Sequence, residues 1–481
     1  MSEIKQKALI GIFWSFCERF GVLFIQFVAN IVLARLLTPD DYGVIGILLV
    51  FTTLSQVFID AGFGAALIQK KNPSKEDYST VFFINIIIAV LCYLVLFFSS
   101  DFISIYFEKP QLSILLQVIG IIVISDAFTT VQNNILIKTL NFKRIANIKI
   151  IVAVISSIAS IIAAFNGLGI WSLVILYSLN SIIKTILMWV LSDWKPSLIF
   201  SKESFHKLFG FGSKLLLASL LSEGYRGLQS IIIGRHLSVR ELGFFTQARQ
   251  LENVPVSSII AVVNQVTFPI FAQLQETKEQ LNSALKRCFQ LLGFINFPAM
   301  ILLSIVAKPL FMFLYGEAWL ESAPYFQGLC LGFGLLLVIH NTNLSILKAA
   351  GKSGIVLKLE IIKKFIGVIL IFLLIHLGVM GLIIALAINS FIEFFINGYC
   401  TGKETGFGIK EQIKVLLPIF LHATIIGAIV YFIPSVIDLS NTLILLVQII
   451  AYITLYLIGA YLVKMQIFNY IINEVREKIK R

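Results

Sequence analysis

Charge is the scarcest property of this sequence. Only 13% of its 481 residues are Asp, Glu, Lys or Arg, whereas 58% are hydrophobic and the mean hydropathy is +0.93. Soluble domains carry roughly a quarter charged residues, because charged side chains cover a surface that faces water. The composition therefore excludes a soluble protein and predicts an integral membrane protein.

Signatures of several other protein classes are also missing. The five cysteines form no CxxC spacing and all lie in apolar stretches, which excludes a disulfide framework and predicts buried free thiols. We expect no metal and no cofactor. A glycine-rich phosphate loop is absent, so ATP hydrolysis is not expected. The N-terminus lacks a short apolar segment with a small-residue cleavage site, so the first helix should stay as a membrane anchor.

The sequence instead contains long apolar runs. A charge-poor run of about 20 residues is long enough for an α-helix to cross a hydrocarbon core of about 30 Å. The runs lack the two-residue alternation of barrel strands, so the predicted fold is an all-α integral membrane protein. Fourteen transmembrane helices are predicted, over residues 8–34, 42–68, 79–99, 112–136, 146–166, 169–191, 210–234, 243–271, 288–306, 324–347, 357–376, 379–400, 415–433 and 442–463.

Lysine and arginine are distributed unevenly between the loops. Most of the 38 lie at the termini and in the even-numbered loops, while the odd-numbered loops hold only Arg35, Lys109, Arg235, Arg240 and Lys308. Because basic residues accumulate in short cytoplasmic loops, both termini are predicted to be cytoplasmic. The same pattern accounts for the net charge of +12. Nucleic acid is not expected as a partner, because no loop is long enough to form a basic soluble surface.

A ten-residue motif occurs twice. ARLLTPDDYG at 34–43 and GRHLSVRELG at 234–243 share an Arg, a Leu, a hydroxyl residue, an acidic residue and a Gly in the same order. Each copy follows an apolar run. Thr38 and Ser238 stand where an N-cap residue would begin the next helix, so each copy is predicted to turn the chain between two membrane helices.

A second match extends this similarity into two halves of the chain. LGIWSLVI at 168–175 corresponds to LGVMGLII at 377–384. Six helices followed by six more with the same loop order indicate a parallel repeat about an axis along the membrane normal. The predicted organisation is an N-terminal six-helix lobe, a cytoplasmic linker, a pseudo-symmetric C-terminal six-helix lobe, and two additional helices with a basic tail, at 1–191, 192–209, 210–400 and 401–481.

Several longer motifs carry a family resemblance. They are ARLLTPDDYGVIGIL at 34–48, GFGAALIQK at 62–70, NGLGIWSLV at 166–174, FGFGSKLLLASLLS at 209–222 and YGEAWLESAPYF at 315–326. With them the chain resembles the polysaccharide-transporter branch of the multidrug/oligosaccharidyl-lipid/polysaccharide exporter superfamily, the Wzx-type flippases.

The resemblance implies both a site and a function. It implies a cavity lined by the first, second, seventh and eighth helices. It also implies flipping of undecaprenyl-pyrophosphate-linked oligosaccharides, the repeat units of surface polysaccharides such as O-antigen or capsule, from the cytoplasmic to the periplasmic leaflet of the inner membrane. The implied partners are this lipid-linked oligosaccharide, membrane lipids and other polysaccharide-assembly proteins.

Ionisable residues at membrane depth gather on the same four helices. Such residues cost about 2.5–3.5 kcal/mol each on insertion scales, so they usually face a cavity or a partner. Counted from the sequence alone, they are Glu18, Arg19, Asp60, Glu223, Arg226, Arg249 and Glu252.

Helical spacing groups these residues with uncharged polar ones. Arg19, Gln26 and Asn30 stand at i, i+7 and i+11, which is one face of a helix. We expect Arg19 and Arg226 to attract the pyrophosphate, because a guanidinium stays charged and donates paired hydrogen bonds. Arg249 is expected near the outer mouth, and the expected sugar contacts are Gln26, Asn30, Gln56 and Gln229.

Structural roles are open for several of these charges. Glu223 with Arg226, and Arg249 with Glu252, also have the i, i+3 spacing of intrahelical ion pairs. Asp60 can hold a coupling proton or sodium ion, or neutralise an arginine. Glu18, Glu223 and Glu252 are candidates for the same two roles. Packing or hydrogen-bonding roles are expected for Asp126, Lys184, His340 and Glu393, and Lys363 and Lys364 are expected to reach lipid headgroups.

Three other functions are weighed against this prediction. A cation-coupled multidrug exporter of the same superfamily would favour an acidic, aromatic cavity, and a lipid II flippase would also need cationic residues. A membrane polysaccharide polymerase or glycosyltransferase would carry a large outside loop with acidic or arginine-rich chemistry. The outside loops here are short. A transporter is therefore predicted, and not an enzyme.

Overall fold

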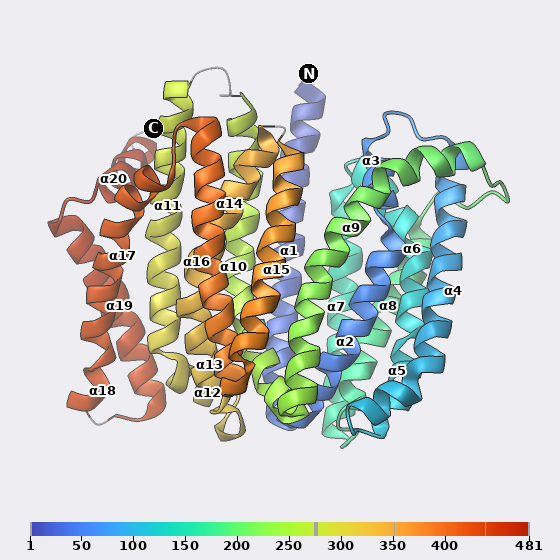
Figure 1. The fold of residues 1–481 in the computed structure, drawn as a ribbon, viewed down its shortest axis with the longest axis horizontal. Coiled ribbons are helices and arrows are strands. Elements are labelled where there is room, and N and C mark those ends of the chain that lie inside the picture. Colours follow the sequence, from blue (N-terminus) through green and yellow to red (C-terminus); the bar gives the residue numbers. More distant parts are fainter. Residues whose placement is uncertain (1, 274–277, 351, 438, 480–481) are drawn as a thin grey trace. The chain divides into compact units, whose positions relative to one another are not determined.

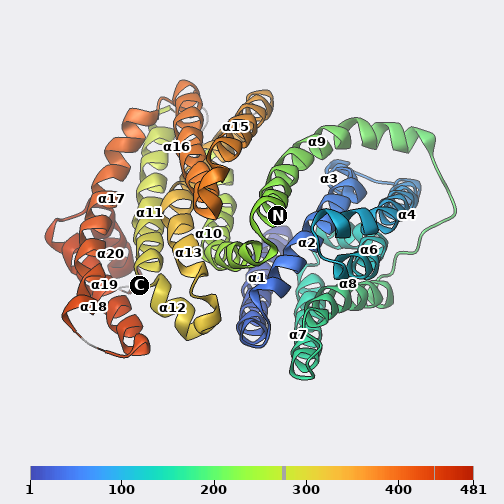
Figure 2. The same ribbon diagram turned by 60° about the horizontal axis from the view of Figure 1, so that its bottom comes forward.

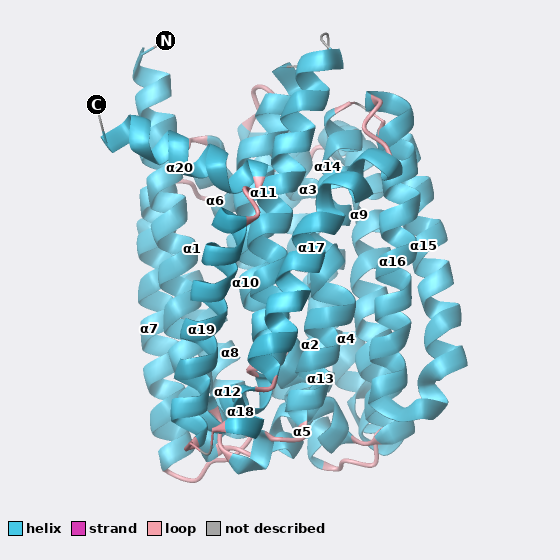
Figure 3. Cartoon of the chain, turned by 90° about the vertical axis from the view of Figure 1, so that its left-hand side faces the viewer, coloured by secondary structure: helices cyan, strands magenta, loops and turns pink. Residues whose placement is uncertain are grey.

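The computed structural model describes residues 2–273, 278–350, 352–437 and 439–479. Within these ranges every regular element is a helix, joined to the next by loops and turns (Figure 3). The predicted all-α fold is therefore confirmed. By contact, the chain divides into two compact units, Met1–Gly243 and Phe244–Arg481.

The first unit is a bundle of long helices with short ones at its ends (Figure 1). α1 packs on α7, α7 on α8, and α9 on α2 and α3. Figure 2 shows α9 curving past α2 and α3. The helices are α1 (Ser2–Leu36), α2 (Pro39–Asp60), α3 (Phe63–Gln69), α4 (Lys75–Tyr106), α5 (Gln111–Ile119), α6 (Ile121–Lys138), α7 (Phe142–Phe165), α8 (Trp171–Leu191), α9 (Lys202–Ile232), the π-helical turn η1 (Ile233–Leu237) and the start of α10 (Val239–Gln273).

The second unit contains the rest of α10 and a second set of long helices. In it α11 packs on α17, and α16 packs on both α14 and α15. Its elements are α11 (Lys278–Ile305), α12 (Ala307–Leu314), η2 (Glu317–Trp319), α13 (Ser322–Gly328), η3 (Leu329–Gly334), α14 (Leu335–Ala349), α15 (Ser353–Leu374), η4 (Ile375–Leu377), α16 (Gly378–Thr405), α17 (Ile409–Tyr431), α18 (Ile433–Val436), α19 (Asn441–Leu462) and α20 (Gln466–Ile479).

The structure gives fewer certain membrane spans than the predicted fourteen. Eleven segments of the described residues are long and apolar enough to cross a membrane, and one of them, Gly354–Thr405, contains both α15 and α16. The long helices α9 and α10 are not among the eleven. The predicted span of α9 carries Lys214, Glu223 and Arg226, which lower its hydropathy. The count of fourteen stays a prediction.

Turns break the second and fourth predicted helices near glycines. The second predicted helix, 42–68, is divided into α2, which ends at Asp60, and α3, which begins at Phe63. Between them, Ala61 and Gly62 have left-handed backbone angles (φ 40° and 73°). A side chain at Gly62 would also collide with α9, because its Cβ would lie 2.3 Å from the Gly212 carbonyl oxygen. The fourth predicted helix is likewise two helices, α5 and α6, which meet at Gly120. Hydrophobicity alone hides such breaks, since both pieces are apolar.

Both copies of the repeated motif begin a helix as predicted. Thr38 caps α2: its Oγ1 accepts from the Asp41 backbone N–H at 3.3 Å, and the Asp41 carboxylate accepts from the Thr38 backbone N–H at 2.9 Å. Ser238 acts in the same way before α10, where its Oγ accepts from the Glu241 backbone N–H at 3.0 Å.

The two copies also contact each other reciprocally. A Cβ on Gly43 would lie 1.8 Å from the carbonyl oxygen of Val239, and a Cβ on Gly243 would lie 1.8 Å from that of Pro39. Val239 has the same place in the second copy that Pro39 has in the first. A contact in which each partner repeats the other's role is what a local twofold relation produces.

Candidate functional site

On α1, the two adjacent charged residues have different surroundings. Arg19 is exposed. Glu18 is largely buried, and its Oε1 accepts from Lys149 Nζ of α7 at 2.7 Å. The carboxylate of Glu18 therefore ties α1 to α7, whereas Arg19 lies at the surface.

The predicted sugar-binding amides differ in accessibility. Gln26 of α1 is exposed and Asn30 is half-buried, with its Nδ2 donating to Tyr42 Oη at 3.4 Å. Gln229 of α9 is buried. Gln26 and Asn30 can therefore be reached in this conformation, while Gln229 cannot.

Gln56 belongs to a polar network that spans three helices. Its Nε2 donates to Asp126 Oδ2 of α6 at 2.7 Å. The other carboxylate oxygen of Asp126 accepts from Ser181 Oγ at 2.8 Å and Lys184 Nζ at 2.5 Å, both on α8. Asp126 and Lys184 looked like isolated packing residues in the sequence, but they form an ion pair. Their separation by 58 positions carries no periodic signal from which the pairing could be predicted.

Asp60 stands at the break between α2 and α3. Its Oδ1 accepts from the Gly64 backbone N–H at 3.3 Å, in the first turn of α3. In the described part of the chain it forms no ion pair, so neutralisation of an arginine by Asp60 is not seen in this conformation. Asp60 is exposed.

On α9, Arg226 forms the intrahelical pair that its spacing allows. Its Nη1 lies 3.3 Å from Glu223 Oε1, yet the arginine side chain remains 70% exposed. The pairing and the exposure coexist, because the guanidinium has five donors and Glu223 engages only part of them.

The predicted α10 pair lies in the second unit. Arg249 Nε is 4.0 Å from Glu252 Oε2, and its guanidinium lies 4.2 Å from the centre of the Phe333 ring. Glu252 is buried, and its Oε1 has no hydrogen-bond partner among the described residues. The Arg249 charge is therefore shared between a carboxylate and an aromatic face.

The second unit contains a buried charge cluster that sequence reasoning missed. Its members are His340 of α14, Glu360, Lys363 and Lys364 of α15, and Glu393 of α16. Lys363 is 1% exposed, with its Nζ 2.5 Å from Glu360 Oε1 and 3.8 Å from Glu393 Oε2. The expectation that Lys363 reaches lipid headgroups is wrong, because two carboxylates hold its ammonium inside the unit.

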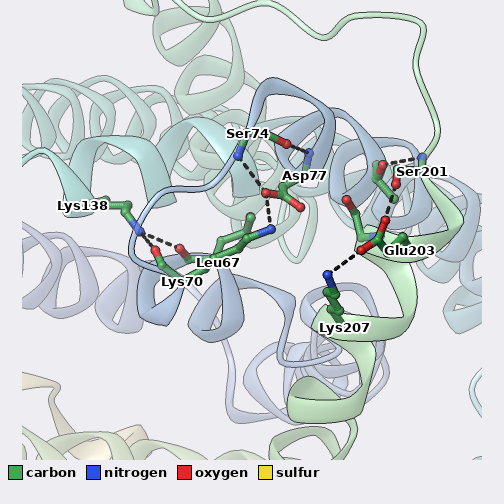
Figure 4. Close-up of polar contacts among 10 residues, drawn as sticks. Leu67, Lys70, Ser74, Asp77, Lys138, Ser201, Glu203 and Lys207 are labelled. Atoms are coloured by element: carbon green, nitrogen blue, oxygen red, sulfur yellow. Dashed lines mark hydrogen bonds and ion pairs between the residues drawn. The ribbon is translucent and has the colours of Figure 1, made fainter.

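A second polar cluster lies in the first unit, around Lys70, Asp77 and Lys138 (Figure 4). The buried carboxylate of Asp77 accepts from Lys70 Nζ at 2.6 Å and from the Ser74 backbone N–H at 2.7 Å, while Ser74 caps α4. Lys138, at the end of α6, donates to the carbonyl oxygens of Leu67, Ile68 and Lys70. The lysine thus binds the carboxyl end of α3, where backbone carbonyls lack helical partners.

The segment before α9 is fixed to α4 at two points. The backbone N–H groups of Ser197 and Ser201 donate to Ser79 Oγ and Thr80 Oγ1, each at 3.0 Å. In the first turn of α9, the hydrogen bond from the Lys207 ammonium to the Glu203 carboxylate holds the pKa of Glu203 below its ordinary value. This cluster secures the linker to the first unit.

All five cysteines are free thiols, as predicted. Only Cys330 is fully buried, however, whereas Cys17, Cys92, Cys288 and Cys400 are partly exposed. Among the described residues no group of His, Cys, Asp and Glu has the arrangement of a metal site.

Comparison with known proteins identifies the family. Residues 32–324, more than half of the 481-residue chain, match the polysaccharide biosynthesis protein family. The chain belongs to this polysaccharide biosynthesis family. The family predicted from the motifs is thereby confirmed.

Relatives of this polysaccharide biosynthesis protein extend over most of its length. The teichuronic acid biosynthesis protein TuaB of Bacillus subtilis (strain 168) is 28% identical over 357 residues, 74% of each chain. The lipopolysaccharide biosynthesis protein WzxC of Escherichia coli (strain K12) is 24% identical over 401 residues, 82% of this chain and 81% of that one.

A solved structure supports the fold. Lipid II flippase MurJ in an inward closed conformation matches with a TM-score of 0.79 at 18% identity, covering 95% of this chain and 100% of that chain. Together, this structural match and the eleven long apolar helical segments show that the chain is a multi-pass integral membrane protein.

Proposed function

We propose that the chain flips undecaprenyl-pyrophosphate-linked oligosaccharides, the repeat units of a surface polysaccharide, from the cytoplasmic to the periplasmic leaflet of the inner membrane. Membership of the polysaccharide biosynthesis family supports the glycan part of this function. The observation that carries the site is the side chain of Arg226, which is 70% exposed on a helix predicted to cross the membrane.

An exposed arginine at membrane depth needs water or an anion. Facing lipid would cost about 2.5–3.5 kcal/mol on insertion scales, a cost that a water-filled cavity avoids. A guanidinium donates paired hydrogen bonds to phosphate oxygens and cannot lose its charge. Glu223 compensates the charge of Arg226 in this structure, and a pyrophosphate would replace one anionic partner by another. Arg19, exposed on α1, is the second proposed pyrophosphate residue.

The remaining proposed contacts serve the oligosaccharide. Gln26 and Asn30 supply amides on the same face of α1 as Arg19. Gln56 would contact a sugar hydroxyl through its carbonyl oxygen, because its amide nitrogen is held by Asp126. Gln229 would contribute after a change in conformation, and Arg249 would act near the outer mouth.

Transport is proposed to proceed by alternating access between the two repeated halves, with fourteen helices and both termini in the cytoplasm. The proposed lobes are 1–191 and 210–400, joined by the linker 192–209 and followed by 401–481. No chemical change of the substrate is required. The driving force would be an ion gradient, with protons or sodium as the coupling ion, the membrane potential, or consumption of the flipped product by other polysaccharide-assembly proteins.

Two other transport functions are less well supported. A multidrug exporter takes up organic cations, which exposed arginines at Arg19 and Arg226 would repel. A lipid II flippase would bind the same pyrophosphate group, so the arginines alone do not distinguish lipid II from a polysaccharide precursor. The family match favours the polysaccharide precursor.

Polysaccharide production in cells tests this function. The chain is produced in its native host after deletion of the chromosomal copy, and surface polysaccharide and inner-membrane lipid-linked oligosaccharide are quantified. Arg19→Ala and Arg226→Ala should each reduce surface polysaccharide at least tenfold and cause lipid-linked oligosaccharide to accumulate, with protein levels unchanged. Arg226→Lys should recover only part of the activity, because an ammonium lacks the paired donors.

Arg287→Ala is the matched control. Arg287 stacks on the Tyr470 ring at 5.3 Å and is not part of the proposed site, so its loss should leave polysaccharide production near the wild-type level. Full production in both Arg19→Ala and Arg226→Ala would refute the proposed site. Loss of polysaccharide without accumulation of the lipid-linked precursor would refute the flippase function.

A further inference from the structure

The buried charge cluster of the second unit is arranged around one histidine. His340 Nδ1 lies 3.2 Å from Glu393 Oε2, and both side chains are almost wholly buried. A carboxylate only accepts hydrogen bonds, so Nδ1 must carry the proton of the neutral imidazole. Nε2 then holds a lone pair, and it has no hydrogen-bond partner among the described residues.

The cluster is electrically neutral only while His340 is uncharged. Lys363 and Lys364 supply two positive charges, and Glu360 and Glu393 supply two negative ones. These four groups are the charges that act on His340. Although α11 and η3 also pack on α14, no charged group of theirs is among them. A proton added to Nε2 would therefore create one net positive charge, opposite a carboxylate that already faces the ring.

The cluster does not offer a site for a metal cation. The Glu393 oxygens are engaged by His340, Lys363, Lys364 and by Asn389 Nδ2 at 3.0 Å. Sodium and other hard cations need several free oxygen ligands, and two ammonium groups at this distance would repel them. A proton needs only the lone pair of Nε2, so the geometry selects a proton.

The edge of the cluster is more accessible than its centre. His340, Lys363 and Glu393 are buried, whereas the side chains of Glu360 and Lys364 are 22% and 20% exposed. These two side chains are therefore accessible from outside the protein, while the three buried ones are not. His340 is eight residues from Lys348 near the end of its span, which corresponds to about 12 Å along the helix.

We propose that His340, positioned by Glu393 and Lys363, is a proton-binding site at membrane depth, and that transport is coupled to the proton gradient through it. The coupling part rests on the proposed flippase function. The proton is taken from water at the edge of the cluster and binds Nε2, with no other bond formed or broken. A protonated His340 would attract Glu393 more strongly than the neutral imidazole does and would strengthen the contact of α14 with α16. Proton binding would therefore favour tighter packing of α14, α15 and α16.

Proton binding can be measured without any substrate. The chain has five histidines, so a variant with His206, His236, His376 and His422 each replaced by Gln leaves His340 as the sole histidine. In lipid nanodiscs, ¹⁵N-histidine spectra of this variant should show Nδ1 protonated and Nε2 unprotonated at high pH. As pH falls, the unprotonated Nε2 resonance should disappear, and Glu393→Gln should move that change to lower pH.

A spectrum in which Nε2 carries the proton at high pH would overturn the proposal, as would an unprotonated Nε2 that persists at every pH at which the protein stays folded. Wild-type protein with all five histidines should contain the same His340 signal, which shows that the four replacements leave the cluster intact.

Coupling is measured in proteoliposomes, with lipid-linked oligosaccharide extracted from the deletion strain as the probe. An imposed pH gradient should raise the wild-type flipping rate several-fold. His340→Gln and Glu393→Gln should flip at the wild-type rate without a gradient and lose the response to it. His422→Asn, at an intramembrane histidine whose Nε2 lies 3.1 Å from the Tyr456 carbonyl oxygen and whose ring packs on the Tyr456 ring, should respond as wild type does.

The outcomes separate the two proposals. A gradient response retained in His340→Gln would overturn the coupling site while leaving the flippase function intact. No flipping of the probe by wild-type protein would overturn the flippase function, and the coupling part of the proposal with it, whereas the histidine spectra would still decide whether the proton site exists.

Discussion

Gly43 and Val239 approach each other so closely that a methyl group on Gly43 would lie 1.8 Å from the Val239 carbonyl oxygen. The same distance separates a methyl group on Gly243 from the Pro39 carbonyl oxygen. The repeated motif therefore specifies more than two similar turns. Its glycine is the residue that permits each helix start to pack against the other.

Alanine at either glycine should destabilise the protein. Neither backbone carbonyl can rotate away without breaking its helix, so Gly43→Ala and Gly243→Ala should each cost at least about 1–3 kcal/mol, the usual range for overpacking. Thermal unfolding in detergent checks this. The double variant should lose less than the sum of the two, because both substitutions open the same contact. Gly224→Ala, with open space around the new methyl group, should leave the melting temperature unchanged or raise it.

The ion pair of Asp126 and Lys184 should stabilise the protein only while both partners are present. Asp126→Asn or Lys184→Met leaves a partly buried charge without its partner, so each should destabilise the first unit. In the double variant both charges are gone and part of the loss should be recovered. A double-mutant cycle from melting data should give a coupling energy of about 0.5–3 kcal/mol. Simple additivity would contradict the pairing.

The Asp77 carboxylate should stabilise the part of the first unit in which the linker contacts α4. It is fully buried and accepts from both Lys70 and the Ser74 backbone (Figure 4). Asp77→Ala should cost about 1–3 kcal/mol, since it removes half of a capping box and a charged hydrogen bond. Glu76→Ala, at the exposed neighbouring carboxylate, should cost much less. Equal melting temperatures of the two variants would show that the cluster adds no stability.

The linker should contact lipid through a short apolar segment. Between the two fixed points at Ser197 and Ser201, the side chain of Leu198 is 95% exposed, and Ile199 and Phe200 are exposed beside it. Apolar residues flanked by Lys195 and Lys202 are typical of a segment at a headgroup boundary. A fluorophore on Leu198→Cys in a cysteine-free background should be quenched by spin-labelled lipids in nanodiscs. The same label on Glu76→Cys should be quenched by aqueous iodide, and iodide quenching at residue 198 as well would contradict lipid contact.

The sequence predicted the helices well, because apolar runs and capping residues are local signals. Thr38 and Ser238 cap the helices that they were expected to begin. The break at Ala61 and Gly62 was missed, since hydropathy does not change across it. The pairing of Lys184 with Asp126 could not be predicted, because contacts between helices depend on how each helix is rotated, and no spacing within one helix records that rotation.

The same limit applies to the candidate site. Helix spacing had left the Glu223 and Arg226 ion pair open as one alternative, and the structure contains it, with the partners three residues apart. Packing or hydrogen-bonding roles were expected for His340 and Glu393, but not their contact with each other at 3.2 Å, which joins two helices at positions 53 apart. Arginine exposure, on which the proposed function rests, likewise came only with the structure.

Native mass spectrometry of the purified protein tests the central claim most directly. Protein extracted from its host in mild detergent should carry a bound polyprenyl-pyrophosphate glycan, released as an intact lipid-linked oligosaccharide. The Arg19→Ala/Arg226→Ala variant should carry only phospholipid. Wild-type protein that binds no lipid-linked glycan, or a double variant that binds it as well as the wild type, would contradict the account.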